Sequence, residues 1–587
     1  DILSGTSRRW QIRPADPTAV QRLCRALGIP PLLATLLVHR GCTTAAEARF
    51  FLEAPLDALH DPWQMAGMAE AVARLRTAVA RREAIRVCGD FDVDGVSGTA
   101  LLAAGLTELG AVVTTRTPHR VRDGYGLPLR FVEEARDDGV RVLVAVDVGI
   151  AAHEAAERAR QLGVDLIVCD HHQPPETLPC ALAVLDPRRP GCGYPFKDLC
   201  GAGIAFKLLQ ALCGPDGADR ALACLDLVAL ATIADVVPLL GENRLLVRHG
   251  LPRIRRRARP GLLALAEAAG LDLAAADPTP SQVAFALAPR LNAAGRMEEG
   301  EAAVRLLLAT DPAEARSLAA GLDAANRKRQ AVERAMLEEA IGGVEGARSA
   351  GTADRVIVLA SPAFHPGVLG IVASRLVERY GVPTALIALV DGDARGSIRS
   401  PAGWHVAAGL ARCADLLQHH GGHEAAGGFS LLPVNIEPFR ARLAALTGGC
   451  GLPPAGAATL TADAEADFPS LDLDLTDALA ALQPHGAGNP EPLLIARQVQ
   501  VMRSPRRVGR NHLKMRLRQT DLDDRVLDSI GFNLGDLLEA LDGPGAPRID
   551  LAFTPERNVW NGRETLQLRV RDLVIPPGIG CCPTGEE

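Results

Sequence analysis

The amino-acid sequence predicts an α/β protein of several domains that is organised around a parallel β-sheet. At 587 residues the chain is too long for a single hydrophobic core. From Ile85 to Pro187 short apolar runs alternate with helical patterns, and such a βαβ series indicates a parallel sheet with helices on both faces. A second series of this kind begins at Arg355, and alternating strands beyond Ala455 are typical of a small β-barrel.

The composition is that of an ordinary globular protein, with 48% hydrophobic and 23% charged residues. No apolar run has the length of a membrane span, and the first residues do not resemble a signal peptide. The 13 cysteines are scattered without paired metal-ligand spacing, which fits a reducing cytoplasm. We therefore expect a cytoplasmic protein that binds no membrane. A net charge of −7 excludes a protein that is basic all over, but not a local positive groove for nucleic acid.

The expected elements follow in chain order. Residues 1–82 show short helical patterns without visible chemistry, so we expect an N-terminal packing region. Strands of the parallel sheet are expected at Ile85–Cys88, Ala111–Thr117, Val140–Val146, Val164–Cys169 and Ala181–Leu185. Helices are expected between them at Ser97–Leu109, Leu129–Asp138 and Ala152–Leu162. A long helical pattern from Ala313 to Ile341 is predicted to connect two lobes.

Acidic side chains follow the first strand, in the stretch VCGDFDVDGVSGT. Asp90, Asp92 and Asp94 stand at alternate positions, and carboxylates this close repel one another unless a cation lies among them. This stretch alone leaves an acidic surface turn open as the alternative to a metal site.

Two later strands also end in residue types that bind metals. Asp147 follows VLVAV, and Asp170, His171 and His172 follow LIVC. Taken singly, an Asp at a strand end is a helix cap or turn former, and a His is a satisfied polar side chain. Because ligand sites of open α/β sheets lie beyond the carboxyl ends of the strands, we expect these side chains to meet at one edge of the sheet.

Asp235 is an acid at the end of an apolar helical segment, ATIADVVPL. An ionised carboxylate rarely lies unpaired in such surroundings, so a metal ligand explains it better than a partly exposed helical acid. Mixed carboxylates and imidazoles suit Mn²⁺ or Mg²⁺ better than Ca²⁺, and no thiolate is placed to favour zinc. Two ions with a bridging carboxylate would accommodate this many acids.

The motifs GDFDVDG, VAVD, CDHH and IADVVPL, in this order and spacing, resemble the four signature motifs of the DHH phosphoesterase superfamily. Further on, LNAAGRM, HPGVLGIVASRL, GSIRS and GGHEAAGG are similar to the RecJ branch of that superfamily, and the resemblance extends from about Trp10 to Leu573. It implies a parallel-sheet DHH catalytic domain at 83–290, connecting helices at 291–350, a second α/β DHH-associated substrate-binding domain at 351–454, and an OB-type β-barrel with a tail at 455–587.

Position by position, the resemblance implies a two-metal cluster. Its expected ligands are Asp90, Asp92, Asp94, Asp147, His171 and Asp235, and the expected catalytic residues are Asp147, His171, His172 and Asp235. His172 is expected beside the cluster, as a ligand or facing the substrate phosphate. Which of the first three acids binds metal directly stays open.

The resemblance also implies a pocket for the 5′ phosphate of the substrate. Its expected residues are Arg120, Arg296, Ser397, Arg399 and His423. A guanidinium group suits bidentate phosphate binding. The residues themselves leave simpler interpretations open, because loop arginines commonly face solvent and paired glycines after a helix commonly form a C-cap. The basic run Arg253–Arg259 is either a solvated helix face or a phosphate track.

In the last domain the strand NHLKMRLRQ alternates apolar and basic side chains. The candidate nucleic-acid-binding residues are Arg507, Arg510, Lys514, Arg516 and Arg518. An antiparallel five-strand barrel of the OB type fits this pattern and the family. A solvated sheet face is the alternative for any one of these side chains. With 3% aromatic residues, the grip on a strand is expected to be mostly electrostatic.

The resemblance implies a single-stranded-DNA-specific exonuclease that degrades 5′→3′ to 5′-mononucleotides with two divalent cations, Mn²⁺ or Mg²⁺, in DNA repair and recombination. It implies a monomer whose partners are single-stranded DNA and, among proteins, single-strand-binding protein and a helicase. A short-oligonucleotide or cyclic-dinucleotide phosphodiesterase would use the same metal site, but smaller relatives of that kind typically lack the terminal barrel. A non-catalytic replication scaffold is the other alternative, and the presence of every motif acid and both histidines argues against it.

Overall fold

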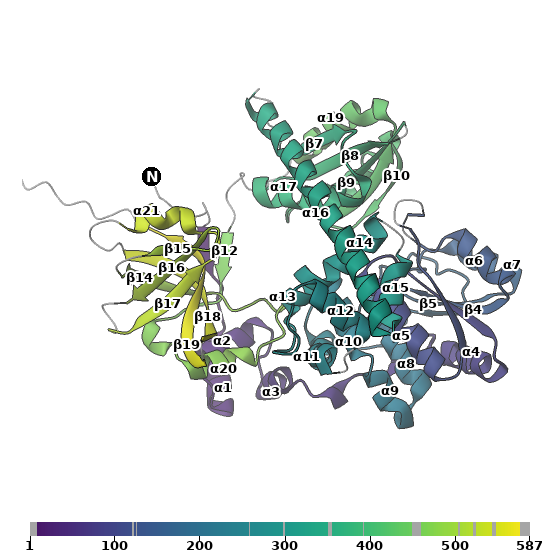
Figure 1. Ribbon diagram of the computed structural model, residues 1–587, viewed down its shortest axis with the longest axis horizontal. Coiled ribbons are helices and arrows are strands. Elements are labelled where there is room, and N and C mark those ends of the chain that lie inside the picture. The colour runs from purple at the N-terminus through teal and green to yellow at the C-terminus, as the bar shows by residue number, and fades with distance from the viewer. Residues whose placement is uncertain are drawn as a thin grey trace, which may run out of the picture. The chain divides into compact units, whose positions relative to one another are not determined.

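The computed structural model describes residues 9–119, 123–124, 126–256, 259–297, 300–349, 355–390, 392–448, 459–502, 505–519, 524–542, 548–560 and 562–575. The chain forms two compact units (Figure 1). The larger unit comprises the described parts of 55–452 with 486–488, and the smaller one those of 1–54, 453–485 and 489–587. The expected N-terminal region 1–82 is thus divided between the two units. Among the described helices, none is long and apolar enough to cross a membrane.

The larger unit is built on a five-stranded parallel sheet with the order β3-β2-β4-β5-β6. Its strands are β2 (Ala84–Gly89), β3 (Val112–Arg116), β4 (Val140–Val146), β5 (Asp165–Cys169) and β6 (Ala183–Leu185), each close to its predicted bounds. The chain passes from β2 to β3 on one side and then to β4 on the other side of β2. The strand order therefore reverses at β2, and the carboxyl end of β2 is where such sheets bind ligands.

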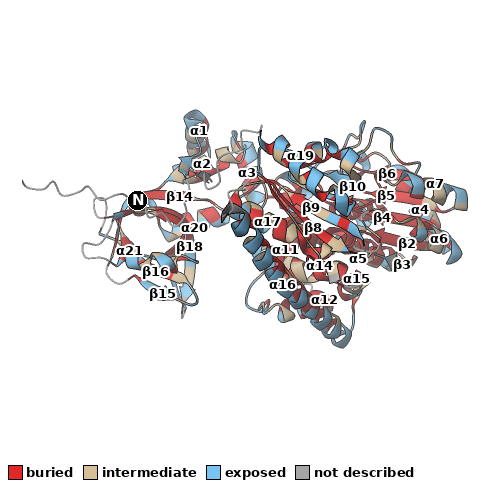
Figure 2. Cartoon of the chain, turned by 90° about the horizontal axis from the view of Figure 1, so that it is seen from above, coloured by how far each residue is buried: buried red, intermediate tan, exposed pale blue. Residues whose placement is uncertain are grey.

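Helices cover both faces of this sheet. They are α4 (Met68–Arg81), α5 (Val93–Glu108) and α8 (Gly201–Cys213) on one face, and α6 (Leu129–Asp137) and α7 (His153–Leu162) on the other. In β4, Val142, Val144 and Val146 belong to the first core, whereas Leu143 and Ala145 belong to the second. Burial on both faces explains the continuous apolar sequence of β4, and Figure 2 shows β4 and β5 as buried strands.

Helix α5 begins four residues before the predicted Ser97. The reason is local, because the Asp92 carboxylate caps α5 by accepting hydrogen bonds from the backbone N–H groups of Asp94 and Gly95, at 3.0 and 3.2 Å. An acid that was singled out for metal chemistry therefore also sets the start of a helix.

Further helices pack on the first face and lead to the connector. They are α9 (Ala218–Leu222), α10 (Leu225–Ala234), α11 (Gly241–Arg256), α12 (Pro260–Ala268), α13 (Pro280–Gln282), the π-helical turn η4 (Val283–Leu287), α14 (Ala288–Met297), α15 (Glu301–Leu308) and the connector α16 (Pro312–Ser349). Within the basic run, Arg259 forms a 2.5 Å ion pair with the fully buried Asp226, so this arginine holds the helices together.

The second α/β domain has a five-stranded sheet of order β10-β11-β9-β8-β7, in which only β7 and β8 are parallel. Its strands are β7 (Ile357–Ser361), β8 (Thr384–Val390), β9 (Asp393–Arg399), β10 (Leu417–Gly422) and β11 (Ala426–Leu431). Its helices are α17 (Leu369–Tyr380), α18 (Val406–Ala411) and α19 (Ile436–Gly448). The connector α16 and α17 pack on one face, and α18 and α19 pack on the other.

The smaller unit is a β-barrel. Its strands are β13 (Ala464–Glu465), β14 (Leu494–Val501), β15 (Arg506–Val508), β16 (His512–Arg518), β17 (Val526–Gly531), β18 (Arg548–Trp560) and β19 (Arg563–Val574), with helices α20 (Leu473–Ala480) and α21 (Leu538–Leu541). The order β14-β18-β19-β17-β16 is closed into a ring by pairing of β14 with β16. One detail differs from the prediction, since β17 and β19 run parallel rather than antiparallel.

The N-terminal segment packs with this barrel. It contains β1 (Arg9–Ile12), α1 (Pro17–Leu27), α2 (Pro31–His39) and α3 (Ala45–Glu53). Strand β1 pairs in parallel with β12 (Thr459–Ala462), and the Trp10 indole donates a 2.9 Å hydrogen bond to Asp572. Because this segment pairs with residues near the other end of the chain, local sequence patterns could not predict that it belongs to the barrel unit.

Candidate metal centre and substrate cleft

The three acids after β2 are held in a tight strand-to-helix turn. A Cβ on Gly95 would lie 2.3 Å from the backbone nitrogen of Asp90, and a Cβ on Gly89 would lie 2.1 Å from Oγ1 of Thr99. Only glycine allows α5 to start this close to the end of β2. The side chains of Asp90 and Asp94 are buried, and that of Asp92 is partly exposed.

The first turn of α8 fixes two of the acids. Asp94 accepts hydrogen bonds from the backbone N–H groups of Gly201 at 2.6 Å and Ala202 at 2.8 Å, where the helix dipole favours negative charge. Asp147, at the end of β4, has a left-handed backbone with φ of 62°. A Cβ on Gly201 would lie 2.7 Å from Cβ of Asp147, so glycine at the start of α8 leaves room for this carboxylate.

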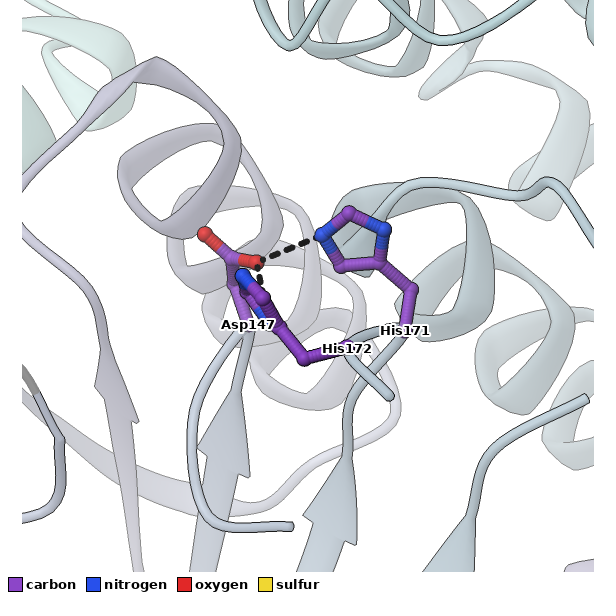
Figure 3. Close-up of side chains that lie close together, drawn as sticks. All are labelled: Asp147, His171 and His172. Carbon is purple, nitrogen blue, oxygen red and sulfur yellow. Dashed lines mark ion pairs between the residues drawn. The ribbon is translucent and has the colours of Figure 1, made fainter. Parts of the chain in front are cut away.

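The histidines at the end of β5 are oriented by their neighbour Asp170. This fully buried carboxylate accepts hydrogen bonds from the backbone N–H groups of His171 at 2.8 Å and Ile150 at 2.9 Å, and lies 2.7 Å from Nδ1 of His172. Both imidazoles then approach one oxygen of Asp147 (Figure 3). His171 Nε2 lies 3.2 Å from Asp147 Oδ1, and His172 Nδ1 lies 3.8 Å from the same atom.

The strand ends and α10 bring all the predicted ligands together. His171 Nε2 lies 3.6 Å from Oδ2 of Asp235, which caps the carboxyl end of α10, and 3.8 Å from Oδ2 of Asp94. Three overlapping groups have ligand atoms within 4.8 Å of one another: Asp90, Asp92 and Asp147; Asp94, His171 and Asp235; and Asp147, His171 and His172. Asp147 and His171 each belong to two of these groups, as a shared site requires.

Burial and mutual repulsion shift the pKa values of these groups. Burial, with the charge of Asp92, raises the pKa of Asp94 to about 6, and burial, with the charges of Asp94 and Asp92, raises the pKa of Asp235 to about 9. The pKa of Asp147 is raised well above its ordinary value by burial and by the surrounding carboxylates. Burial and the charge of His172 lower the pKa of His171 to about 3, which leaves a neutral imidazole. These acids are fully ionised together only when a cation neutralises them.

The donor set fits divalent cations. The buried atoms Asp147 Oδ1, His171 Nε2 and Asp235 Oδ2 have no hydrogen-bond partner within the described residues. Buried polar atoms are normally satisfied, so three such atoms pointing at one another indicate a bound group. Carboxylate oxygens with an imidazole nitrogen suit Mn²⁺ and Mg²⁺.

A cleft of about 1530 Å³ opens beside this centre, between the sheet domain and the second α/β domain. Arg296, Ser397 and Arg399 all line it. Arg399 donates a 2.9 Å hydrogen bond to Oγ of Ser397, and Arg296 donates a 2.7 Å hydrogen bond to the carbonyl oxygen of Gly367. A Cβ on Gly370 would lie 2.4 Å from Nη2 of Arg399, so the start of α17 closely approaches this arginine.

Of the residues predicted for the phosphate pocket, His423 does not line this cleft, and Arg120 is not among the described residues. The ring of His423 stacks on that of His172, with centroids 6.4 Å apart and an interplanar angle of 22°, which places His423 on the side of the metal centre. Arg120 lies outside the described residues.

Comparison with known proteins agrees with this arrangement. Three family models match the chain: the DHH family N-terminal domain at residues 84–232, the DHHA1 domain at 353–448 and the RecJ OB domain at 462–572. The single-stranded-DNA-specific exonuclease RecJ of Dickeya dadantii is 38% identical over 95% of this chain and 98% of its own length. The chain belongs to the RecJ family.

Solved structures of RecJ from Thermus thermophilus share the fold. The structure in complex with Mn²⁺ has a TM-score of 0.82 and 34% sequence identity, and covers 97% of this chain and 80% of its own. The structure in complex with Mg²⁺ has a TM-score of 0.75 and 33% identity, over 97% of this chain and 79% of its own.

Two side chains of the RecJ cleft were not found by sequence reasoning. Phe285 is 82% exposed on η4 and lines both this cleft and a neighbouring pocket of about 570 Å³. Val236, directly after Asp235, is 69% exposed in the cleft and has a left-handed φ of 59°. Both residues lie in apolar runs that predict buried side chains. The π-helical turn exposes Phe285, and the left-handed backbone exposes Val236.

In the barrel, the burial of β16 alternates as predicted. Leu513, Met515 and Leu517 are buried, and Lys514, Arg516 and Arg518 are partly or fully exposed. Arg510 is also exposed, in the turn before β16. Arg507 is exposed as well, but it donates a 3.0 Å hydrogen bond to the carbonyl oxygen of Gly535 and pairs with Asp536. Arg518 has weaker contacts of the same kind, at 3.5 Å from Asp524 and 3.4 Å from Gln500.

An aromatic pair, with His512 partly exposed and Phe532 exposed, extends this face, which also carries the exposed Asp528 opposite Arg516. Lys514 pairs with Ile530 and Arg516 with Asp528 in the β16–β17 register, so His512 and Phe532 continue the same outward row. Their rings meet edge to face with centroids 5.0 Å apart, and Phe532 is 50% exposed. An aromatic ring beside cations is the usual platform for an unpaired base.

Proposed function

We propose that this chain is a metal-dependent exonuclease that degrades single-stranded DNA 5′→3′ to 5′-mononucleotides, in DNA repair and recombination. The observation that carries the proposal is the position of the arginine-lined cleft beside the carboxylate–imidazole centre, within one compact unit. A relative that matches this chain along nearly its whole length is a single-stranded-DNA-specific exonuclease, which supports the activity and its single-strand specificity.

The metal ligands in this proposal are those whose atoms converge in the structure. They are Asp90, Asp92, Asp94, Asp147, His171 and Asp235. Two divalent cations held by these residues, Mn²⁺ or Mg²⁺, would lower the pKa of a water so that it could lose a proton at neutral pH, and would offset negative charge on the phosphate. The chain itself holds the carboxylates in place through the first turn of α8 and keeps His171 neutral by burial.

His172 faces the scissile phosphate in this proposal. Burial alone would lower the pKa of His172, but the hydrogen bond to Asp170 and the charge of that carboxylate outweigh it and raise the pKa. A protonated imidazole beside the metal centre can donate a hydrogen bond to a phosphate oxygen. His423, stacked on His172, would close this side of the substrate.

In this proposal the cleft determines the direction in which the strand is degraded. Arg296, Ser397 and Arg399 would hold the terminal 5′ phosphate, with Arg120 as a further candidate. When that phosphate is held, only the bond one nucleotide away reaches the metal centre, so a mononucleotide is released. A cleft between two lobes admits one strand and excludes a duplex.

The barrel would grip single-stranded DNA by charge and stacking. Lys514, Arg516, Arg518 and Arg510 would contact the phosphates, while Phe532 would stack on a base. Arg507, which is committed to Gly535 and Asp536, would instead position the neighbouring loop. We further propose a cytoplasmic monomer that works with a helicase and single-strand-binding protein, because these partners produce and coat such strands in cells.

The proposal is tested with purified protein, Mn²⁺ or Mg²⁺, and oligonucleotides that carry a label at one end. We expect mononucleotides from the 5′ end of single-stranded DNA and slow attack on blunt duplex. Release from the 3′ end, or equal attack on blunt duplex, would refute it. A cyclic dinucleotide hydrolysed faster than the polymer would favour the small-phosphodiesterase alternative, and no hydrolysis with either metal would favour the scaffold.

A further inference from the structure

The residue after Asp235 has a backbone conformation that its side chain disfavours. Val236 has a φ of 59°, in the left-handed region that glycine and asparagine adopt most readily. For a β-branched residue this conformation is a real outlier, and such strain persists only where the surroundings impose it. The conformation leaves the valine side chain 69% exposed in the cleft.

The position of Val236 relates it to one part of the substrate. Its neighbour Asp235 lies 3.6 Å from His171 in the metal centre, and Val236 lines the same cleft as Arg296, Ser397 and Arg399. A nucleotide with its 5′ phosphate at these arginines and its 3′ phosphodiester at the metals has only its sugar between the two sites. Val236 follows a residue of the metal centre and lines the cleft of these arginines, so its exposed apolar side chain lies in the part of the cleft that this sugar would occupy.

We propose that Val236 contacts the deoxyribose of the terminal nucleotide and disfavours a 2′-hydroxyl there, which makes it a specificity-determining residue; this inference rests on the function proposed above. The apolar C2′ of deoxyribose loses nothing against a valine side chain. A 2′-hydroxyl loses its water and finds no partner. An apolar contact rejects an added hydroxyl by about 10-fold to 100-fold.

The test compares three 5′-phosphorylated oligonucleotides of one sequence: all-deoxy, with one ribonucleotide at the 5′ terminus, and with one ribonucleotide at the fifth position. The rate of release of the first nucleotide is measured with Mn²⁺ for the wild-type chain and for Val236→Gly and Val236→Asn, which suit a left-handed backbone. In the wild type we expect the terminal ribonucleotide to lower the rate about 10-fold to 100-fold, and the fifth-position ribonucleotide to have no such effect. In both variants the rate for the all-deoxy strand should exceed the rate for the strand with a terminal ribonucleotide by no more than roughly 3-fold, since the apolar contact is gone.

A matched control is Val434→Gly, which changes another exposed valine outside the cleft and should keep the wild-type ratio. Thermal unfolding shows whether the variants fold, and glycine at residue 236 is expected to raise the unfolding temperature by relieving strain. If a variant folds but cleaves too slowly, the ratio of affinities for the deoxy and ribo termini, measured in EDTA, decides the question. The inference is overturned if Val236→Gly keeps the wild-type ratio of the all-deoxy rate to the terminal-ribonucleotide rate. It is also overturned if the wild type cleaves both strands at the same rate. Failure of the wild type to cleave the all-deoxy strand would instead refute the proposed function.

Discussion

His171 Nε2 lies 3.2 Å from Asp147 Oδ1, and neither atom has a hydrogen-bond partner within the described residues. A neutral imidazole and a buried carboxylate oxygen at this separation gain little from each other alone, but both can donate a lone pair to one cation. Burial and the charges of the neighbouring acids raise the pKa of Asp147 well above its ordinary value, and the neutral imidazole of His171 supplies no positive charge to offset them. The centre is organised for metal rather than for folding stability.

Asp147→Asn should therefore change activity and stability in opposite directions. Asparagine tolerates the left-handed backbone at this position. We expect the rate with Mn²⁺ to fall by at least about 100-fold, because a ligand is lost. The unfolding temperature in EDTA should rise, because the raised pKa of Asp147 makes this carboxylate take up a proton when the metal-free chain folds, whereas asparagine is neutral in both states. Undiminished activity in a nuclease assay would contradict the metal assignment.

The stability of the metal-free protein should decrease as pH rises. The folded-state pKa values of Asp94 and Asp235 are raised to about 6 and about 9, above the ordinary value of 3.8, so the folded state holds protons that the unfolded state has lost. Their contribution to stability is present at low pH and is lost between about pH 4 and pH 9. Mn²⁺ replaces these protons, so the rise in unfolding temperature that it causes should grow from pH 6 to pH 9. Thermal unfolding with Mn²⁺ or EDTA checks this, and a Mn²⁺ effect independent of pH would contradict it.

Gly370→Ala should disturb the phosphate pocket without touching the metal centre. The added Cβ would lie 2.4 Å from Arg399 Nη2 and 3.2 Å from Ser397 Oγ, so the guanidinium must move. We expect kcat/KM for a 5′-phosphorylated strand to fall by on the order of 100-fold. The preference over a 5′-hydroxyl strand should be lost. Gly321→Ala in α16 is the control, because a Cβ there meets nothing within 4 Å and alanine favours a helix.

Asp170→Asn should act through His172. The carboxylate lies 2.7 Å from Nδ1 of His172 and raises its pKa against the effect of burial. We expect activity to fall by about 10-fold to 100-fold. The alkaline limb of the pH–rate profile should move to lower pH, because the imidazole then loses its proton more easily. In a His172→Gln background the Asp170→Asn change should no longer move this limb, and a shift that persists there would exclude His172 as the titrating group.

Two substitutions in the barrel should separate stacking from charge. Phe532→Ala should weaken binding of a long single strand by about 1–3 kcal/mol while leaving its salt dependence unchanged. Arg516→Ala should lower the salt slope by about one charge. Binding is measured across a series of salt concentrations in EDTA. Equal salt slopes for the wild type and Arg516→Ala would remove this arginine from the nucleic-acid-binding face.

Local patterns determined much of this fold and its metal centre. The strand β4 was predicted with the same bounds because a strand buried on both faces is continuously apolar. The meeting of Asp90, Asp147 and His171 followed from parallel strands that end at one edge. The alternation of buried and exposed side chains along β16, as at Leu513 and Lys514, was likewise predicted, since side chains of a strand repeat with a period of two. These properties depend on neighbouring residues and on the rules of parallel sheets.

Tertiary structure alone decided the rest. The pairing of β1 with β12 joins residues more than four hundred positions apart and divides the N-terminal region between two units, which no local pattern encodes. Phe285 and Val236 lie in apolar runs, and only a π-turn and a left-handed backbone turn them into the cleft. An apolar run predicts only that its side chains favour a contact that removes them from water. Whether it meets the core or a substrate depends on backbone geometry that packing imposes.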